Sequence, residues 1–141
     1  MQIPFELSHE FSPGSTPEEN SFALRALLIA LVALDRGYLR NHPRVPPLYA
    51  SGVVYVRTPL WLTTAAMYRR GYGDCKSLAA ALIAERAEEG IECRPVFRDI
   101  RRVDGGLDFH ILVQCPDGTY EDPSKVCGMR EYQILTENDR E

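Results

Sequence analysis

The sequence predicts one α+β domain, with helices in its first 90 residues and an antiparallel sheet after them. Two observations carry this prediction. Between Leu78 and Ala87, before a break at Gly90, apolar residues recur at intervals of three and four, as on one face of a helix, and from Ile91 they alternate, as in a strand. A length of 141 residues, with 45% hydrophobic and 26% charged residues, fits one globular domain and argues against a disordered chain or a long coiled coil.

The N-terminal part predicts one long helix and a short strand. Thr16-Pro17 is typical of an N-cap and a first helical residue, and Gly37 is typical of a helix end, so the helix should span about 17–36. Three prolines make 38–48 an irregular connection, and the apolar residues at 53–57 predict a strand.

Two further helices should precede the sheet. Thr58-Pro59 is a second cap and first-turn pair, which predicts a helix over about 58–70. Asp74 is a natural N-cap for a third helix, which should carry Cys75 in its first turn, bury one apolar face and end at Gly90.

Three strands complete the expected domain. Alternation predicts strands at 91–98, 107–115 and 119–122, joined by turns at 104–106 and 116–118. Beyond the last strand the chain should continue as a polar, loop-like segment.

The second of these turns sets a register. Pro116-Asp117-Gly118 suits a three-residue hairpin loop with its glycine in the left-handed conformation. Such a loop places Cys115 opposite Thr119 and puts Asp122 on the same face as His110, one diagonal step away. Diagonal cross-strand neighbours lie roughly 7–8 Å apart, so a carboxylate and an imidazole there can meet.

Charge and hydropathy exclude some classes of partner. The net charge of −4 makes nucleic acid an unexpected partner. The longest apolar run, 22–34, is shorter than the about 20 residues of a membrane span and is interrupted by Arg25, so no membrane segment is expected. The N-terminus does not resemble a secretory signal and the four cysteines form no CxxC pair, which predicts a cytoplasmic protein whose cysteines remain thiols.

Cys75, His110 and Asp122 are the candidate catalytic residues. At a helix N-terminus the unpaired amides and the helix dipole favour the thiolate, which is the reactive form of cysteine. The charge of Asp74 opposes this effect, so Cys75 needs a basic partner. His110 could hold the thiolate as an ion pair and Asp122 could orient the imidazole. Taken singly, a cysteine at this position is more often a buried core residue than a nucleophile, and a strand histidine is more often structural than a base.

Four motifs together resemble the core of the transglutaminase-like superfamily. In chain order they are RGYGDC at 70–75, EGIECRPV at 89–96, FHILV at 109–113 and GTYEDP at 118–123. The resemblance implies a papain-like cysteine-enzyme fold, in which a helix bearing the cysteine packs on an antiparallel sheet bearing the histidine and aspartate.

Residue by residue, the resemblance implies Cys75 as nucleophile, His110 as base and Asp122 as orienting residue. It also implies a thioester acyl-enzyme. Water would then make the protein a peptidase or amidase acting on a protein or peptide, and a lysine amine would make it a cross-linking acyltransferase. A cross-linking enzyme must exclude water from the thioester, usually with lids or extra domains, and this short chain offers little material for them. Hydrolysis is therefore the expected reaction. Small stand-alone domains of this pattern resemble proteins of bacteria and tailed phages.

The resemblance covers only part of the chain. A single transglutaminase-like domain would span 1–141, with the motif-bearing core at about 58–124 and a helical part at 1–57. Two positions depart from the family pattern: Lys76-Ser77 follows the cysteine where relatives often carry an acidic residue, and Ile111-Leu112 follows the histidine where they often carry an aromatic one.

Two other classes of function stay open. A catalytically silent binding or assembly module could keep the same fold. A zinc site could be built from Cys75, His110 and either Cys93 or Cys115, but the absence of closely spaced ligand pairs leads us to expect no metal and no other cofactor.

The remaining expectations concern the oxyanion hole and the other cysteines. The amide of Cys75 is one natural donor to an oxyanion, and Tyr72 and Trp61 are candidates for shaping the site or supplying a second donor. Cys93 and Cys115 fall on apolar strand faces and should be buried.

Overall fold

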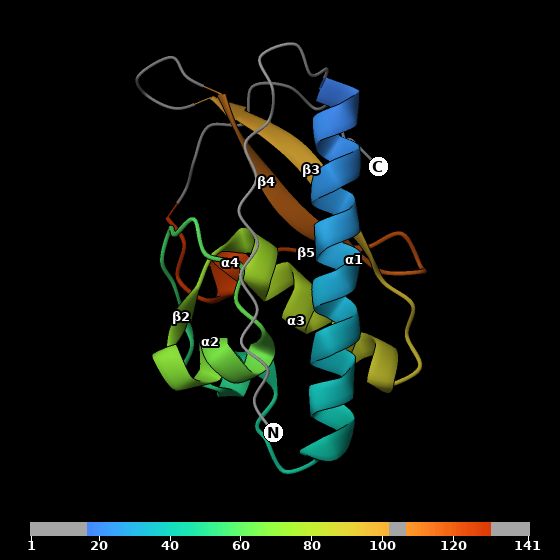
Figure 1. The fold of residues 1–141 in the computed structure, drawn as a ribbon, viewed down its shortest axis with the longest axis vertical. Helices are drawn as coiled ribbons and strands as arrows, with labels where there is room; N and C mark the ends of the chain where they lie inside the picture. Colours follow the sequence, from blue (N-terminus) through green and yellow to red (C-terminus); the bar gives the residue numbers. More distant parts are fainter. Residues whose placement is uncertain (1–16, 102–106, 131–141) are drawn as a thin grey trace.

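The computed structural model describes residues 17–101 and 107–130, which form a mixed α+β structure (Figure 1). The expected cap Thr16 and the expected turn at 104–106 lie outside these residues. The elements follow in the order α1 (Pro17–Asn41), the 3₁₀ helix η1 (Leu48–Ala50), β1 (Val54–Tyr55), α2 (Thr64–Arg70), β2 (Tyr72–Gly73), α3 (Cys75–Glu88), β3 (Arg94–Arg101), β4 (Leu107–Gln114), β5 (Tyr120–Glu121) and α4 (Pro123–Val126).

Helices α1 and α3 pack on each other and α3 packs on the middle strand of the sheet. Strands β3, β4 and β5 form an antiparallel sheet in that order, and the short strands β1 and β2 pair in parallel. In Figure 1 α1 stands upright beside the sheet and α3 lies below it. Fully buried side chains from each layer meet in the core: Leu28 of α1, Leu78 and Leu82 of α3, and Ile111 and Val113 of β4.

Helix α1 is longer than predicted, because Gly37 does not end it. A glycine that ends a helix adopts a positive φ, and Gly37 does not. The last turn stays helical because it has its own contacts: Arg40 forms an ion pair with Glu88 of α3, and Asn41 Nδ2 donates to the Gly37 carbonyl at 2.8 Å. Within the described ranges, no helix combines the length and apolar character that crossing a bilayer requires.

Helix α2 begins later than predicted. Its N-cap is Thr63, whose hydroxyl accepts a hydrogen bond from the Ala66 amide at 3.2 Å. The predicted cap Thr58 instead forms a local turn, in which its hydroxyl accepts from the Leu60 amide. Tertiary contact decides between the two threonines, because the first amide of α2, at Thr64, donates to the buried carboxylate of Asp35 at 2.6 Å.

Helix α3 and the sheet agree closely with the sequence. The helix starts at Cys75, directly after Asp74, and the left-handed glycine at Gly90 follows its end. Strand β3 starts three residues later than predicted, at Arg94, whereas β4 nearly matches its predicted range.

The hairpin between β4 and β5 has the predicted register. The Cys115 amide donates to the Thr119 carbonyl at 2.8 Å, and Gly118 has a φ of 88°. The ladder then pairs Gln114 with Tyr120 and Val113 with Glu121. The residues after β5 are not loop-like as predicted, because α4 begins at once at Pro123.

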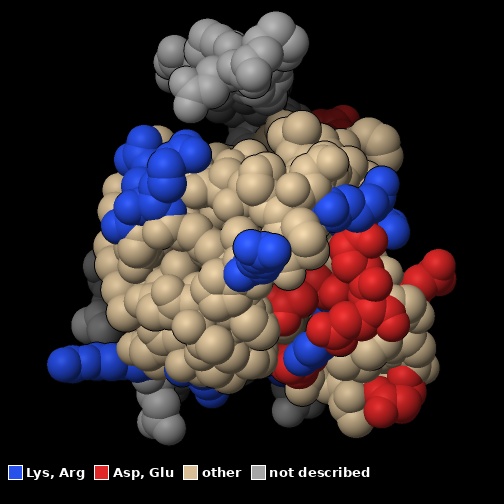
Figure 2. Space-filling model, turned by 90° about the horizontal axis from the view of Figure 1, so that it is seen from below, with Lys and Arg blue, Asp and Glu red and all other residues tan. Residues whose placement is uncertain are grey.

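Charged side chains of both signs lie on the face seen from below, where the acidic ones gather in a patch with basic ones beside it (Figure 2). Ion pairs join the C-terminal half of α3 to its neighbours. Glu88 Oε1 lies 2.6 Å from Arg40 Nε and 3.3 Å from Arg36 Nε, and Arg86 Nη2 lies 2.9 Å from Glu121 Oε1. The last pair ties α3 to β5, next to the candidate residue Asp122.

Candidate functional site

His110 and Asp122 meet as the hairpin register predicts. Nε2 of His110 lies 3.0 Å from Oδ2 of Asp122 and 3.1 Å from Oδ1. His110 is almost fully buried, at 2% exposure, in the middle strand of the sheet. An ionised carboxylate can only accept a hydrogen bond, so Nε2 carries the hydrogen. A second partner of the neutral ring would then meet Nδ1, its acceptor nitrogen.

The electrostatics of the pair keep Asp122 ionised. Burial alone would raise the pKa of its carboxyl, but the hydrogen bond and charge of His110 and the amide and charge of Lys125 outweigh burial and lower the pKa below its ordinary value. The amide of Lys125 donates to Oδ1 at 3.2 Å, because Asp122 is also the N-cap of α4. The Asp122-Pro123 pair carries this cap signal in the sequence, but our reading of that segment as a loop missed it.

Cys75 is the first residue of α3 and is 9% exposed. The preceding β2 approaches α2 so closely that Gly73 has no room for a side chain. A Cβ at this position would lie 2.5 Å from Met67 Sδ and 3.4 Å from Ser77 Cβ. The glycine two residues before the cysteine therefore allows β2 and the start of α3 to lie against α2.

A buried ion pair flanks the cysteine, and sequence reasoning missed it. The side chain of Asp74 makes no capping hydrogen bond; it pairs instead with Lys76, and both side chains are less than 10% exposed. Lys76 Nζ also donates to the Thr58 carbonyl at 2.7 Å and lies 5.8 Å from the centre of the Trp61 ring. The negative charge expected to oppose a thiolate at Cys75 is thus compensated locally. The only signal in the sequence was the opposite charges on either side of the cysteine.

The two candidate site-shaping residues differ in their surroundings. Trp61 is partly buried against the core and lies beside Lys76, on the segment that leads into α2. Ser77 steadies that segment, because its hydroxyl accepts from the Leu62 amide at 2.9 Å. Tyr72 is also half-buried, but its hydroxyl lies 3.4 Å from Arg70 Nη1. Trp61 therefore lies next to Lys76 at the start of α3, whereas the Tyr72 hydroxyl contacts Arg70.

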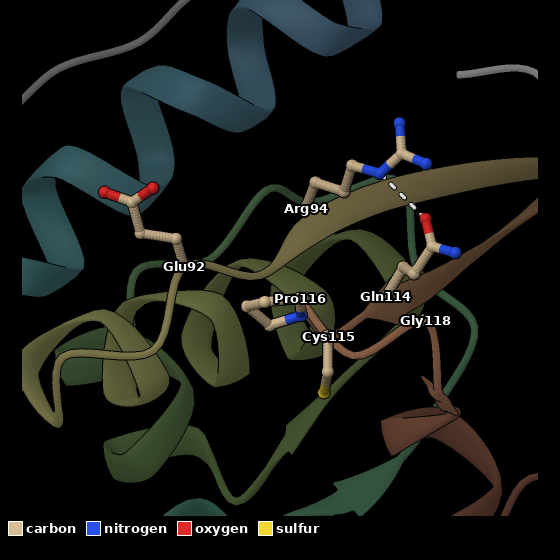
Figure 3. A pocket seen from close by; sticks show the side chains of 6 residues that line it. All are labelled: Glu92, Arg94, Gln114, Cys115, Pro116 and Gly118. Carbon is tan, nitrogen blue, oxygen red and sulfur yellow. Dashed lines mark hydrogen bonds between the residues drawn. The ribbon is translucent and has the colours of Figure 1, made fainter.

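Neither of two surface pockets of the described residues is lined by a candidate catalytic residue. One pocket of about 200 Å³ lies where β3 begins and β4 ends, lined by Glu92, Arg94, Gln114, Cys115, Pro116 and Gly118 (Figure 3). Across residues 17–101 and 107–130, no three His, Cys, Asp or Glu side chains are arranged so that they could hold a metal ion.

The arrangement can support nucleophilic chemistry at sulfur. A cysteine begins a helix, the helix packs on the strand that bears the histidine, and a carboxylate binds that imidazole through Nε2. Comparison of the chain with protein-family models, curated proteins and solved structures found no match.

Proposed function

We propose that the chain is a cysteine hydrolase with a transglutaminase-like fold, which cleaves a peptide or amide bond through a thioester at Cys75. His110 is the general base and acid in this proposal, and Asp122 is the residue that orients it. The hydrogen bond between His110 Nε2 and Asp122, at 3.0 Å, is the observation that carries the proposal. Because Nε2 is bound to Asp122, Nδ1 is the ring nitrogen that acts on the Cys75 thiol in this proposal.

The first half-reaction forms the acyl-enzyme. Nδ1 of His110 takes the proton of the Cys75 thiol, and the resulting imidazolium is stabilised by Asp122. The thiolate attacks the carbonyl carbon, and the amide of Cys75 at the start of α3 stabilises the oxyanion that develops. The imidazolium then gives its proton to the departing amine, and the acyl group remains on sulfur.

The second half-reaction releases the acid. His110 accepts a proton from water, the water oxygen attacks the thioester carbonyl, and the thiolate of Cys75 departs. The buried Asp74–Lys76 pair supports this role for Cys75, because Lys76 compensates the one acidic side chain next to the nucleophile. The order of the elements, with the cysteine on a helix followed by the histidine and aspartate on or beside antiparallel strands, supports the transglutaminase-like fold.

Site-resolved alkylation tests the proposal without a known substrate. The protein is treated with iodoacetamide between about pH 5 and 9, and each cysteine is quantified by mass spectrometry. Cys75 should label well below its reference pKa of about 8.5, and this early labelling should be lost in His110→Ala. Cys127 is the internal control, because burial raises the pKa of its thiol and no such partner is expected for it. Labelling of Cys75 no faster than that of Cys127 across this range would contradict the proposal.

Substrate profiling then separates hydrolysis from acyl transfer. The protein is incubated with a mixture of peptides, with and without an added primary amine, and products are identified by mass. We expect the products of hydrolysis in both cases. An amine adduct that replaces the acid product would overturn hydrolysis in favour of cross-linking, and loss of every product in Cys75→Ala is expected in either case.

A further inference from the structure

Cys93 and Cys115 form a close pair of thiols at the end of the sheet where β3 begins and β4 ends. Their Sγ atoms lie 3.7 Å apart, and neither is in a disulfide. Cys93 directly precedes β3 and Cys115 directly follows β4, so they extend the ladder by one step beyond the pair Arg94–Gln114. Both are half-buried, whereas the strand pattern predicted that they would be buried.

We propose that Cys93 and Cys115 are an oxidation site, which a low-molecular-weight disulfide such as oxidised glutathione converts into a cross-strand disulfide. This inference is independent of the proposed hydrolase function. It concerns two thiols that the proposed reaction does not use, and its test needs no substrate.

The backbone geometry suits the bond. Directly opposite residues of an antiparallel pair have Cα atoms about 4.5 or 5.5 Å apart, and both values fall within the range that disulfides span. The two sulfur atoms already face each other, so closing the remaining gap needs side-chain rotation and no change of register. The other two cysteines, Cys75 at the start of α3 and Cys127 at the end of α4, belong to different elements.

Access and ionisation indicate an order of events. Cys115 is only partly buried and contributes to the lining of the 200 Å³ pocket, although its sulfur points away from the side chains of Arg94 and Gln114 in Figure 3. Burial, reinforced by the hydrogen bond to Cys115, raises the pKa of Cys93 to about 12, so Cys93 is a poor first nucleophile. Cys115 therefore reacts first and Cys93 resolves the intermediate.

The reaction balances as two thiol–disulfide exchanges. The thiolate of Cys115 attacks one sulfur of oxidised glutathione, which breaks its S–S bond and releases one glutathione thiolate. The thiolate of Cys93 then attacks the Cys115 sulfur of the mixed disulfide and releases the second glutathione. Two protein thiols are oxidised, and one glutathione disulfide is reduced to two thiols. The 3.7 Å separation makes the second step effectively intramolecular.

The expected consequence is a more stable protein with an unchanged site. The bond would close a loop from Cys93 to Cys115 that contains the paired strands β3 and β4, and such a cross-link restricts the unfolded chain. The register that places Asp122 beside His110 would be preserved, because the two cysteines already face each other in it.

The test uses the full chain, first reduced and then equilibrated with oxidised glutathione. Peptide mapping without reductant should find one peptide pair joined through Cys93 and Cys115, with the loss of two hydrogen atoms from the intact mass. The Tm should rise by about 5–10 °C and return to its starting value with dithiothreitol. Cys127→Ser is the matched control and should behave like the wild type, whereas Cys93→Ser should gain neither the linked peptides nor the rise in Tm.

Three outcomes would overturn the proposal: a disulfide that joins other cysteines, a lasting glutathione adduct on Cys115 with no link to Cys93, or linked peptides without a change in Tm. Glutathione on Cys75 is scored separately by the same mapping. Because the mapping is done on the wild type, the result does not depend on how well a variant folds.

Discussion

The carboxylate of Asp122 lies 3.0 Å from Nε2 of His110 and at the same time caps α4 through the Lys125 amide. One side chain therefore joins the middle strand of the sheet to the helix that follows β5. Because Asp122 has both roles, a suitable substitution can test its effect on the imidazole separately from its effect on the stability of α4. The cap can be kept while the carboxylate that orients the imidazole is removed.

Asp122→Asn should retain the fold and lose most of the activity. Asparagine is as good an N-cap as aspartate, so the free energy of unfolding should stay close to that of the wild type. Its amide cannot stabilise an imidazolium as a carboxylate does, and in the Ser-His-Asp enzymes the same change lowers kcat by about 10⁴-fold. The measurements are urea unfolding and turnover on a peptide found by profiling. Asp122→Ala is the control, which should lose about 1 kcal/mol more because the cap is also removed. Wild-type turnover in Asp122→Asn would remove Asp122 from the mechanism.

Lys76→Met should destabilise the protein and make the thiol of Cys75 harder to ionise. The substitution leaves the charge of Asp74 buried without its partner, which typically costs about 3–5 kcal/mol. It also restores an uncompensated negative charge beside Cys75, so alkylation of Cys75 should require a higher pH than in the wild type. Urea unfolding and the pH dependence of labelling measure the two effects.

The double variant Asp74→Asn with Lys76→Met is the control for that prediction. It removes both charges, and replacing a complete buried pair by neutral groups is often close to neutral for stability. The double variant should therefore regain most of the stability that Lys76→Met loses. Equal losses in the single and double variants would show that Lys76 acts through its contacts with Thr58 and Trp61, not through its charge.

Local signals in the sequence predicted the parts of the site that depend on neighbouring residues. The break at Gly73 and the cap position of Asp74 placed Cys75 at a helix start, and the three-residue turn after Cys115 fixed the face on which Asp122 lies. These features are decided within a few residues, by helix termination and turn geometry.

Contacts between distant residues decided what the sequence could not predict. Thr58 and Thr63 are equally good cap residues, and the choice depends on Asp35, which lies on α1 and binds the first amide of α2. Likewise Gly37 stays helical because the turn after it reaches α3 through Arg40. Propensity is a weak prior where such tertiary contacts compete with it.

Gly73→Ala should destabilise the protein by about 1–3 kcal/mol, as overpacking of a core does. The new Cβ would lie 2.5 Å from Sδ of Met67, which is fully buried and cannot move aside without disturbing the core. Gly37→Ala is the matched control, because a Cβ there meets no atom within 4 Å and alanine favours the helix by about 0.5–1 kcal/mol.

A double-mutant cycle identifies the contact responsible. Met67→Ala removes the atoms that clash and leaves a cavity, so it is destabilising alone, by about 2–5 kcal/mol. Combined with Gly73→Ala, the loss should be smaller than the sum of the two single losses, because the new methyl group enters vacated space. Additive losses in urea unfolding would rule out Met67 as the source of strain.

Asp35→Asn should make the protein more stable at pH 8 and change it little near pH 4. Asp35 is fully buried on α1; one carboxylate oxygen accepts from the Thr64 amide and, among the described residues, the other has no hydrogen-bond partner. Burial outweighs the hydrogen bonds to Thr64 and raises the pKa of the carboxyl from 3.8 to about 7. The folded protein therefore favours the protonated form.

The sign of the pH dependence follows from that direction. Asp35 imposes no ionisation cost below its unfolded pKa of 3.8, and stability is lost as the pH rises from there to about 7, after which the loss is constant. A difference of about three pKa units corresponds to at most about 4 kcal/mol. Asparagine keeps an acceptor for the Thr64 amide and cannot ionise. The difference in unfolding free energy between variant and wild type, measured in urea from about pH 4 to 8, should therefore grow with pH and level off above 7. A difference that stays constant over this range would mean that the pKa of Asp35 is the same in the folded and unfolded protein, and one that keeps growing up to pH 8 would mean that Asp35 does not ionise in the folded protein within it.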